Sequence, residues 1–128
     1  MAAAMETVTK KLSEEVTKFN NLQKELQKVC TTRQQLDEQL NENKIVKEEM
    51  DLLEDEANVF KMIGPAMIKQ ELKDAKDNVN GRIKYISGEL KRHDDTIKDI
   101  ESKQMEQKEV IAKLQAQIKQ AQAKVAKP

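Results

Sequence analysis

The stretch VFKMIGPAMIKQ, Val59 to Gln70, lies near the middle of a chain otherwise made of charged residues with regularly spaced aliphatics. Large apolar residues stand on both sides of Gly64-Pro65. This dipeptide is a turn signal, and the apolar runs that flank it are typical of short strands. The stretch therefore predicts a β-hairpin.

A bent loop between helices, carrying apolar side chains, is the alternative interpretation of this stretch. A hairpin has stronger consequences, because two strands alone are only marginally stable in water. Its two apolar faces and two unpaired edges need other strands to cover them. We therefore expect an oligomerisation surface made by six residues: Val59, Phe60, Met62, Ile63, Met67 and Ile68.

The half of the chain after the hairpin has an unbroken heptad pattern. Its apolar and seam-compatible residues follow alternating steps of four and three, which predicts a helix packed against a partner helix in a left-handed coiled coil. Asp74 is a plausible N-cap of this helix. The seam residues are Val79, Ile83, Ile86, Leu90, His93, Ile97, Ile100, Gln104, Gln107, Ile111, Leu114, Ile118, Ala121 and Val125.

The half before the hairpin repeats this pattern from Met5 to Leu40, through polar Glu15 and Arg33. After Leu40 two successive steps of three shift the seam, which predicts local overwinding. Asn58 suits a helix end, because Asn tolerates the left-handed conformation. We expect a mainly α fold: a long antiparallel helical coiled-coil hairpin with one central β-hairpin. The expected parts are an N-terminal coiled-coil helix over 5–57, a β-hairpin for oligomerisation over 58–72 and a C-terminal coiled-coil helix over 74–126.

Composition argues against an enzyme. With 128 residues, 36% charged and 2% aromatic, the chain is poorly suited to a large globular core. The many carboxylates lie at exposed heptad positions rather than in a cleft, and neither a metal-ligand cluster nor a phosphate-binding loop is present, so we expect no catalytic residue, no cofactor and no metal. The 23 basic and 23 acidic residues balance, which gives no general attraction to nucleic acid.

Three single features have ordinary structural interpretations. His93 lies in the seam without a second metal ligand at helical spacing. Cys30 follows the seam residue Val29, has no partner for a disulfide, and is interpreted as a small half-buried side chain in a reducing compartment. The tail after Glu109 is basic, yet lysines also favour a helix C-terminus and no aromatic residue is present for base stacking. We expect no nucleic-acid partner, no membrane partner, and a cytoplasmic location.

Over nearly its whole length the chain resembles the β-type subunits of prefoldin, and the central part is the specific part of this resemblance. The resemblance is carried by QLNENKIVKEEMDLLEDEANVFKMIGPAMIKQE, residues 39–71, and by NVNGRIKYISGELKR, residues 78–92. It implies a hexamer of two α-type and four β-type subunits whose hairpins form a platform. It also implies binding of unfolded or nascent polypeptides, notably actin and tubulin, at the coiled-coil tips and delivery to the cytosolic chaperonin without ATP hydrolysis.

The ends of the two arms are the expected client-binding sites, because helix ends fray and the seam loosens there. Weak apolar contacts from several arms on one platform would add up through multivalency. A structural coiled-coil scaffold or tether without client-holding activity is the alternative function, since heptads alone do not separate the two. The expected client-binding residues are Met5, Val8, Leu12, Val16, Phe19, Leu114, Ile118 and Val125.

Overall fold

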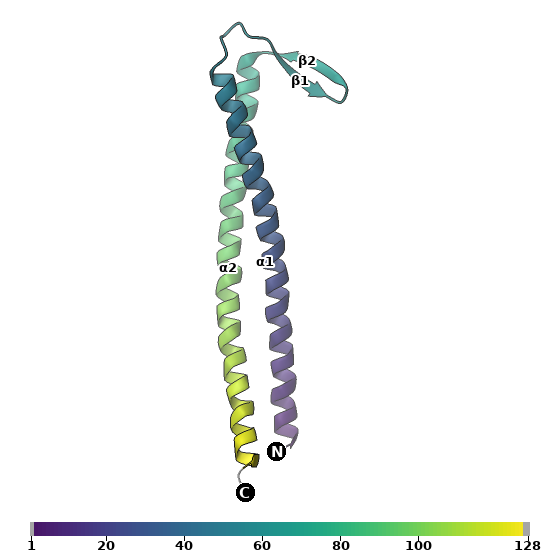
Figure 1. Ribbon diagram of the computed structural model, residues 1–128, viewed down its shortest axis with the longest axis vertical. Helices are drawn as coiled ribbons and strands as arrows, with labels where there is room; N and C mark the ends of the chain where they lie inside the picture. The colour runs from purple at the N-terminus through teal and green to yellow at the C-terminus, as the bar shows by residue number, and fades with distance from the viewer. Residues whose placement is uncertain (1, 127–128) are drawn as a thin grey trace. The chain divides into compact units, whose positions relative to one another are not determined.

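The computed structural model contains two long helices and one small sheet (Figure 1). It describes residues 2–126 and the side chains of residues 2–124. The elements in chain order are α1 (Ala2–Asp51), β1 (Val59–Ile63), β2 (Ala66–Gln70) and α2 (Leu72–Ala126). The predicted mainly α fold with one antiparallel hairpin is confirmed.

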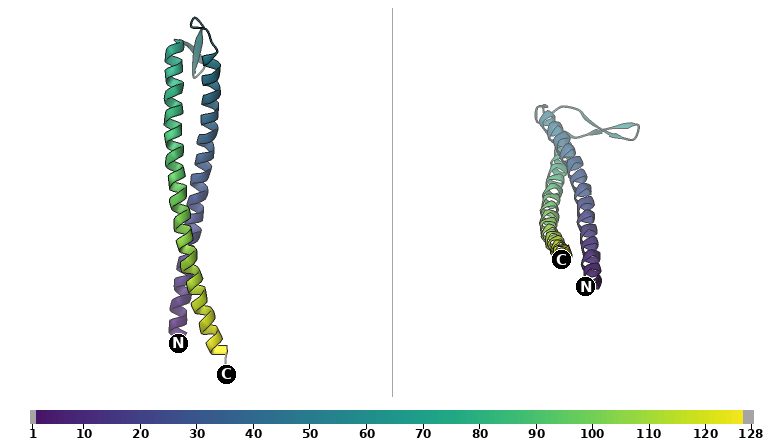
Figure 2. Two further views of the ribbon diagram at one scale, coloured as in Figure 1. Left: turned by 90° about the vertical axis from the view of Figure 1, so that its left-hand side faces the viewer. Right: turned by 60° about the horizontal axis from the view of Figure 1, so that its bottom comes forward.

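The chain divides into two compact units, and both helices contribute to each. The hairpin unit is Thr31–Asp94, and the terminal unit combines Met1–Cys30 with Asp95–Pro128. In the hairpin unit, β1 and β2 extend to one side of the helix ends that they connect (Figures 1 and 2). Among residues 2–126, no helix contains an apolar stretch long enough to cross a membrane.

The two strands are antiparallel, with Ile63 opposite Ala66 and Val59 opposite Gln70. Gly64 and Pro65 alone connect them, and Gly64 has a φ of 59°. A positive φ at the first of two central turn residues, and not at the second, is the pattern of a type II′ turn. The turn follows from the Gly-Pro order, since Gly adopts a positive φ without strain and Pro cannot. The hairpin interpretation holds, and the bent loop does not.

The core of the hairpin unit is a short apolar seam between α1 and α2. Leu40, Ile86 and Leu90 are buried in one cluster, and Leu36 and Ile83 pack against it. The heptad pattern predicted each of these five positions. Burying such side chains stabilises the helix pair by about 1.5–3 kcal/mol each.

A polar pair extends this seam toward the boundary of the hairpin unit. The guanidinium Nε of Arg33 donates a hydrogen bond of 2.5 Å to Oδ1 of Asp94. Because the two side chains are 37% and 46% exposed, the pair contributes little to stability. It joins α1 to α2 at Arg33, a position that the heptad pattern predicted to be polar.

In the terminal unit the seam mixes buried apolar residues with polar layers. Ile100 and Leu114 are buried, and so is Gln104. The Nε2 of Gln104 donates a hydrogen bond of 2.7 Å to Oε1 of Gln23. Gln107 donates to both the backbone oxygen and the carboxylate of Glu15. Since Glu15 precedes Gln23 while Gln107 follows Gln104, the two helices run antiparallel here.

The helix bounds differ from the expected ones on both sides of the hairpin. Helix α1 ends at Asp51 rather than Ala57. The amides of Leu52 and Leu53 donate to carbonyls only three residues earlier, which tightens and ends the last turn. The expected left-handed Asn58 is wrong, because no non-glycine residue of the described range has a positive φ. After the seam shift, Val46 and Leu53 are exposed. The residues that follow Asp51 therefore gain little free energy from packing, and the helix does not continue through them.

Helix α2 begins at Leu72, two residues earlier than expected. The amide of Ala75 donates to the carbonyl of Glu71, so Glu71 is the residue whose carbonyl accepts the first helical bond. Asp74 consequently lies inside the first turn, where its negative charge favours the helix dipole. The prediction of Asp74 as N-cap is wrong.

Cys30 is exposed, which corrects the expected half-buried side chain. One residue on a helix turns the side-chain direction by about 100°, and this rotation takes Cys30 off the seam to which Val29 belongs. His93 is half-buried in the seam as expected. Its Nδ1 lies 2.7 Å from the backbone oxygen of Glu89, four residues earlier in the same helix. The imidazole is therefore in contact with its own helix.

Candidate assembly and client-binding surfaces

The hairpin presents two faces, because residues opposite each other in an antiparallel ladder point to the same side. With the observed register, one face carries Phe60, Met62, Met67 and Lys69. The other carries Val59, Lys61, Ile63, Ala66, Ile68 and Gln70.

Both faces of the hairpin are largely uncovered. Met62 and Met67 are 68% and 65% exposed, and Phe60, Ile63 and Ile68 are about half exposed. Val59 is partly covered. All six residues predicted for oligomerisation thus lie on this one element, and five of them are exposed.

The hairpin also has two open edges. Within the described residues β1 pairs only with β2, so the outer N–H and C=O groups of both strands lack strand partners. Exposed apolar faces combined with open edges are typical of a surface that pairs with other chains. The geometry allows both strand addition at the edges and apolar packing on the faces.

At the end of the terminal unit, the two helices enclose an apolar hollow of about 550 Å³. Met5 and Val8 line it from α1, and Ile118 and Ala121 line it from α2. Ala2 and Ala4 contribute methyl groups, and Lys124 borders it. This hollow could receive an apolar side chain through non-directional contacts.

The hollow takes in three of the predicted client-binding residues: Met5, Val8 and Ile118. Leu12 is half-buried in the seam and Leu114 is buried. Val16 is 37% exposed just beside the seam. Phe19 is half-buried, with Nζ of Lys108 5.9 Å from the centre of its ring. Val125 belongs to α2, but its side chain lies outside the described side chains.

Within the described residues, α1 is helical from Ala2 and α2 continues to Ala126. The apolar side chains there lie partly against each other across the seam. Sequence reasoning missed Ala2, Ala4 and Ala121 as lining residues. The alanine run at the start of the chain was the available signal, because small side chains leave open space between two helices.

Glu15 and Gln107 form a polar layer inside the terminal unit. The side chain of Glu15 is only 12% exposed. The hydrogen bond from the Gln107 amide lowers the pKa of Glu15 below its ordinary value of 4.5, with further support from Lys18 and Lys11 against the opposing effect of burial. An ionised carboxylate held by a donor is favoured over the protonated form.

Within residues 2–126, no group of three or more His, Cys, Asp or Glu side chains is arranged to hold a metal ion. The two surfaces described above are instead apolar and open. Together with the two-helix coiled coil, they define an α-helical coiled-coil protein with one exposed β-hairpin.

Comparison with known proteins identifies the family. A family model described as "Prefoldin subunit" matches residues 13–125. The chain is 45% identical to Prefoldin subunit 6 of Bos taurus and of Homo sapiens, over 92% of each chain. It is 44% identical to Prefoldin subunit 6 of Arabidopsis thaliana, over 91% of this chain and 90% of that protein. The chain therefore belongs to the prefoldin subunit family, whose members are co-chaperone subunits.

A solved structure supports the fold assignment. The crystal structure of the prefoldin beta subunit from Thermococcus strain KS-1 matches with a TM-score of 0.69 and 23% identity, covering 92% of this chain and 95% of that one. The family resemblance carried by residues 39–71 and 78–92 is thereby confirmed, and so is the similarity of the arrangement of helices and hairpin to a β-type subunit.

Proposed function

We propose that this chain is a β-type subunit of a hexameric prefoldin, with two α-type and four β-type subunits, and that its hairpin joins it to its neighbours. The observation that carries the proposal is the exposure of five large apolar hairpin residues on both faces of a two-stranded sheet. An isolated sheet of this kind is marginal in water. Pairing with the hairpins of other subunits would cover both its faces and its edges.

The client-binding part of the proposal concerns the arm ends. The apolar hollow lined by Met5, Val8 and Ile118 supports binding of exposed apolar side chains of unfolded or nascent polypeptides, including actin and tubulin. The complex would then deliver them to the cytosolic chaperonin in the cytoplasm. No ATP hydrolysis or other enzymatic step belongs to this proposal, because apolar holding and release require only reversible burial.

The strength of holding follows from the size of the hollow. Burial contributes about 25 cal/mol per Å² of apolar surface, so one side chain in one hollow binds weakly. Several arms on one platform would raise the avidity by about 10²–10⁴. Each contact could still dissociate quickly, which suits transfer of a client to the chaperonin.

The test is aggregation of chemically denatured actin in the presence of the assembled hexamer. We compare a complex carrying Met5→Ser, Val8→Ser and Ile118→Ser in this subunit with the unmodified complex. The matched control replaces three exposed apolar residues outside both surfaces, Ile45, Leu52 and Met105, by Ser. The expected result is an intact hexamer with weaker suppression of aggregation for the first variant only.

Multivalency can mask the loss of one arm, so the same substitution of lining residues is extended to the arm ends of the other subunits. If a hexamer altered on every arm still suppressed aggregation as well as the control, the arm ends would not hold clients. A coiled-coil scaffold without holding activity would then be the better description.

A further inference from the structure

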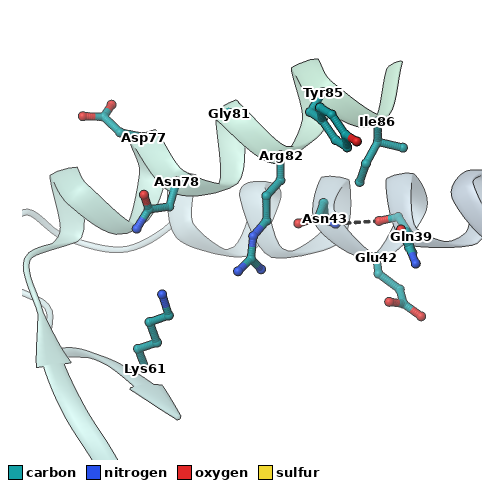
Figure 3. Close-up of a pocket in the computed structure, with 10 residues that line it drawn as sticks. All are labelled: Gln39, Glu42, Asn43, Lys61, Asp77, Asn78, Gly81, Arg82, Tyr85 and Ile86. Atoms are coloured by element: carbon teal, nitrogen blue, oxygen red, sulfur yellow. Dashed lines mark hydrogen bonds between the residues drawn. The ribbon is translucent and has the colours of Figure 1, made fainter. Parts of the chain in front are cut away.

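A second hollow, of about 710 Å³, lies in the hairpin unit where three elements meet. Lys61 borders it from β1 and Glu42 from α1, while Gly81, Arg82 and Tyr85 border it from α2 (Figure 3). Its lining combines apolar surface with charged and amide side chains, unlike the hairpin faces. Neither the packing of the seam nor the hairpin turn explains why these side chains lie around one hollow.

Two cations converge on this hollow. Figure 3 shows the ammonium of Lys61 and the guanidinium of Arg82 pointing into the same space, whereas Asp77 points away from it. Among the residues that the structure describes, no ion pair joins either cation to an acidic side chain. Like charges that share one space repel each other, and an anion placed between them removes that cost.

The surface of α2 beside the cations is shaped for close approach. A Cβ atom added at Gly81 meets nothing within 4 Å, so packing within the chain does not require glycine there. Glycine nevertheless costs a helix about 1 kcal/mol relative to alanine. One turn further on, Tyr85 is 68% exposed. Its aromatic ring is therefore uncovered next to Gly81, where no side chain projects from the helix.

We propose that this hollow receives an acidic segment of a neighbouring prefoldin subunit, with a carboxylate between Arg82 and Lys61 and adjoining side chains against Tyr85. Lys61 and Arg82, rather than the net charge of the lining, select the occupant, because a guanidinium and an ammonium together match a carboxylate. The carboxylates of Glu42 and Asp77 border the same hollow and balance its formal charge. Lys61 also lies on the same hairpin face as Ile63 and Ile68. The inference rests on the proposed assembly through the hairpin and extends that surface onto α2.

Photo-cross-linking identifies the occupant directly. Tyr85 is replaced by p-benzoylphenylalanine in the assembled hexamer, the complex is irradiated, and the cross-linked peptides are identified by mass spectrometry. The expected product joins position 85 to an acidic segment of another prefoldin subunit. Cross-links only within this chain, cross-links to a protein outside the complex, or no cross-link would each overturn the proposal.

Charge reversal measures the contribution of the cations. Tagged wild-type and variant chains are co-expressed in equal amounts with the other subunits, and native mass spectrometry gives the ratio in which they enter the hexamer. The double variant Lys61→Glu and Arg82→Glu is expected to enter at below one tenth of the wild-type level. The control, Lys84→Glu and Lys91→Glu, makes the same charge change at exposed positions of α2 and should compete equally. Equal entry of both double variants would overturn the proposal.

Gly81→Leu provides a variant that the isolated chain tolerates, because the space at Gly81 is open and leucine favours helix. It should enter the hexamer less well than Gly88→Leu, at which the space is also open; equal entry would contradict an occupant near Gly81. Hairpin variants in the same assay separate the two proposals. If Val59→Ser, Phe60→Ser and Ile63→Ser together block entry while the charge reversal does not, only the present inference fails. If neither blocks entry, the proposed assembly through the hairpin fails as well.

Discussion

The hairpin and the arm ends both present apolar side chains, yet in different states. On the hairpin, Met62 and Met67 are about two-thirds exposed and no helix of the described chain covers either face. In the terminal unit, Met5 and Val8 are half-buried, and Leu114 is buried. The apolar side chains of the hairpin therefore lack packing partners within the described chain, whereas those of the arm ends are already packed in part against the other helix.

This difference predicts two kinds of binding. A surface with no internal partner gains its full burial energy when another chain covers it, so the hairpin suits a permanent contact. At the arm ends a client gains only the area that the two helices leave open, or has to displace a contact between them. Contacts of this second kind would be weak and reversible, as the proposed holding of clients requires.

The largest expected effect is at the hairpin. Replacing Val59, Phe60 and Ile63 together by Ser removes large apolar side chains from both faces, and we expect the altered subunit to be lost from the hexamer. Helix content should stay close to that of the wild type, because α1 and α2 contain none of the three positions. Native mass spectrometry and far-UV circular dichroism measure the two quantities.

The corresponding control is the replacement of Ile45, Leu52 and Met105 by Ser, which removes three exposed apolar side chains outside the hairpin. This control should assemble normally. Wild-type hexamer yield from the hairpin variant would show that assembly uses another surface, and the contrast between the two regions would no longer hold.

The next effect concerns the seams of the two units. Leu40 is buried in the apolar cluster of the hairpin unit, and Leu40→Ala should lower the local free energy of helix opening by about 2–3 kcal/mol, within the usual cost of such substitutions. Leu12 in the terminal unit is only half-buried, so Leu12→Ala should cost about 1 kcal/mol.

Amide hydrogen exchange of the assembled complex, followed by mass spectrometry, reports these opening free energies segment by segment. A larger loss for Leu12→Ala than for Leu40→Ala would reverse the expected order. It would mean that the arm end, rather than the segment beside the hairpin, is the tightly packed part of the coiled coil.

A smaller effect is expected at the turn. Gly64 has a φ of 59°, a conformation that costs a residue with a side chain about 1–2 kcal/mol. Gly64→Ala should therefore lower entry into the hexamer by about fivefold to thirtyfold in competition with the wild type. Gly88→Ala is the matched control, because it adds the same methyl group within α2, where open space and a better helix former favour it. Equal entry of both would show that the turn conformation does not limit assembly.

Much of this fold follows from sequence pattern. A step of four and three residues places side chains on one helix face, and every predicted seam position from Val79 to Ala121 is buried or half-buried. The same logic predicted Leu36 and Leu40. After the shift, the predicted seam positions Asn43 and Met50 are half-buried in α1. The prediction was wrong beyond Asp51, where the helix ends although the apolar pattern continues to Ala57, because helix length there depends on packing that periodicity does not report.

The candidate surfaces were only partly predictable. Apolar residues around Gly64-Pro65 indicated the hairpin, since turn chemistry is local. The hollow of the terminal unit depends on which side chains of two distant segments leave space between them. The alanine run at the start of the chain and the seam position of Ala121 indicated small side chains there, but not that the two would line one hollow. The convergence of Lys61 and Arg82 likewise requires the three-dimensional path of β1 beside α2 (Figure 3).

The smallest expected effect concerns the polar layer between Glu15 and Gln107. The hydrogen bond from the Gln107 amide lowers the pKa of Glu15 below 4.5. Since the folded pKa lies below the unfolded one, the layer stabilises the paired helices fully above the ordinary glutamate value. This stabilisation is lost as the pH falls through the lower, folded value. Near neutral pH the layer should show no pH dependence.

Removing the donor tests this assignment. In Gln107→Ala the pKa of Glu15 should rise toward its ordinary value, which NMR titration of the 13C-labelled carboxyl group measures. In Glu15→Gln the side chain keeps its shape but has no carboxyl to titrate, so the terminal unit should lose less stability than the wild type on acidification below pH 4.5. An unchanged Glu15 pKa in Gln107→Ala would mean that the neighbouring lysines, and not the amide, hold the carboxylate ionised. The hydrogen bond between Gln107 and Glu15 would then contribute nothing to the pairing of the two helices at this layer. The terminal unit would differ from the apolar seam around Leu40 only in how deeply its seam residues are buried.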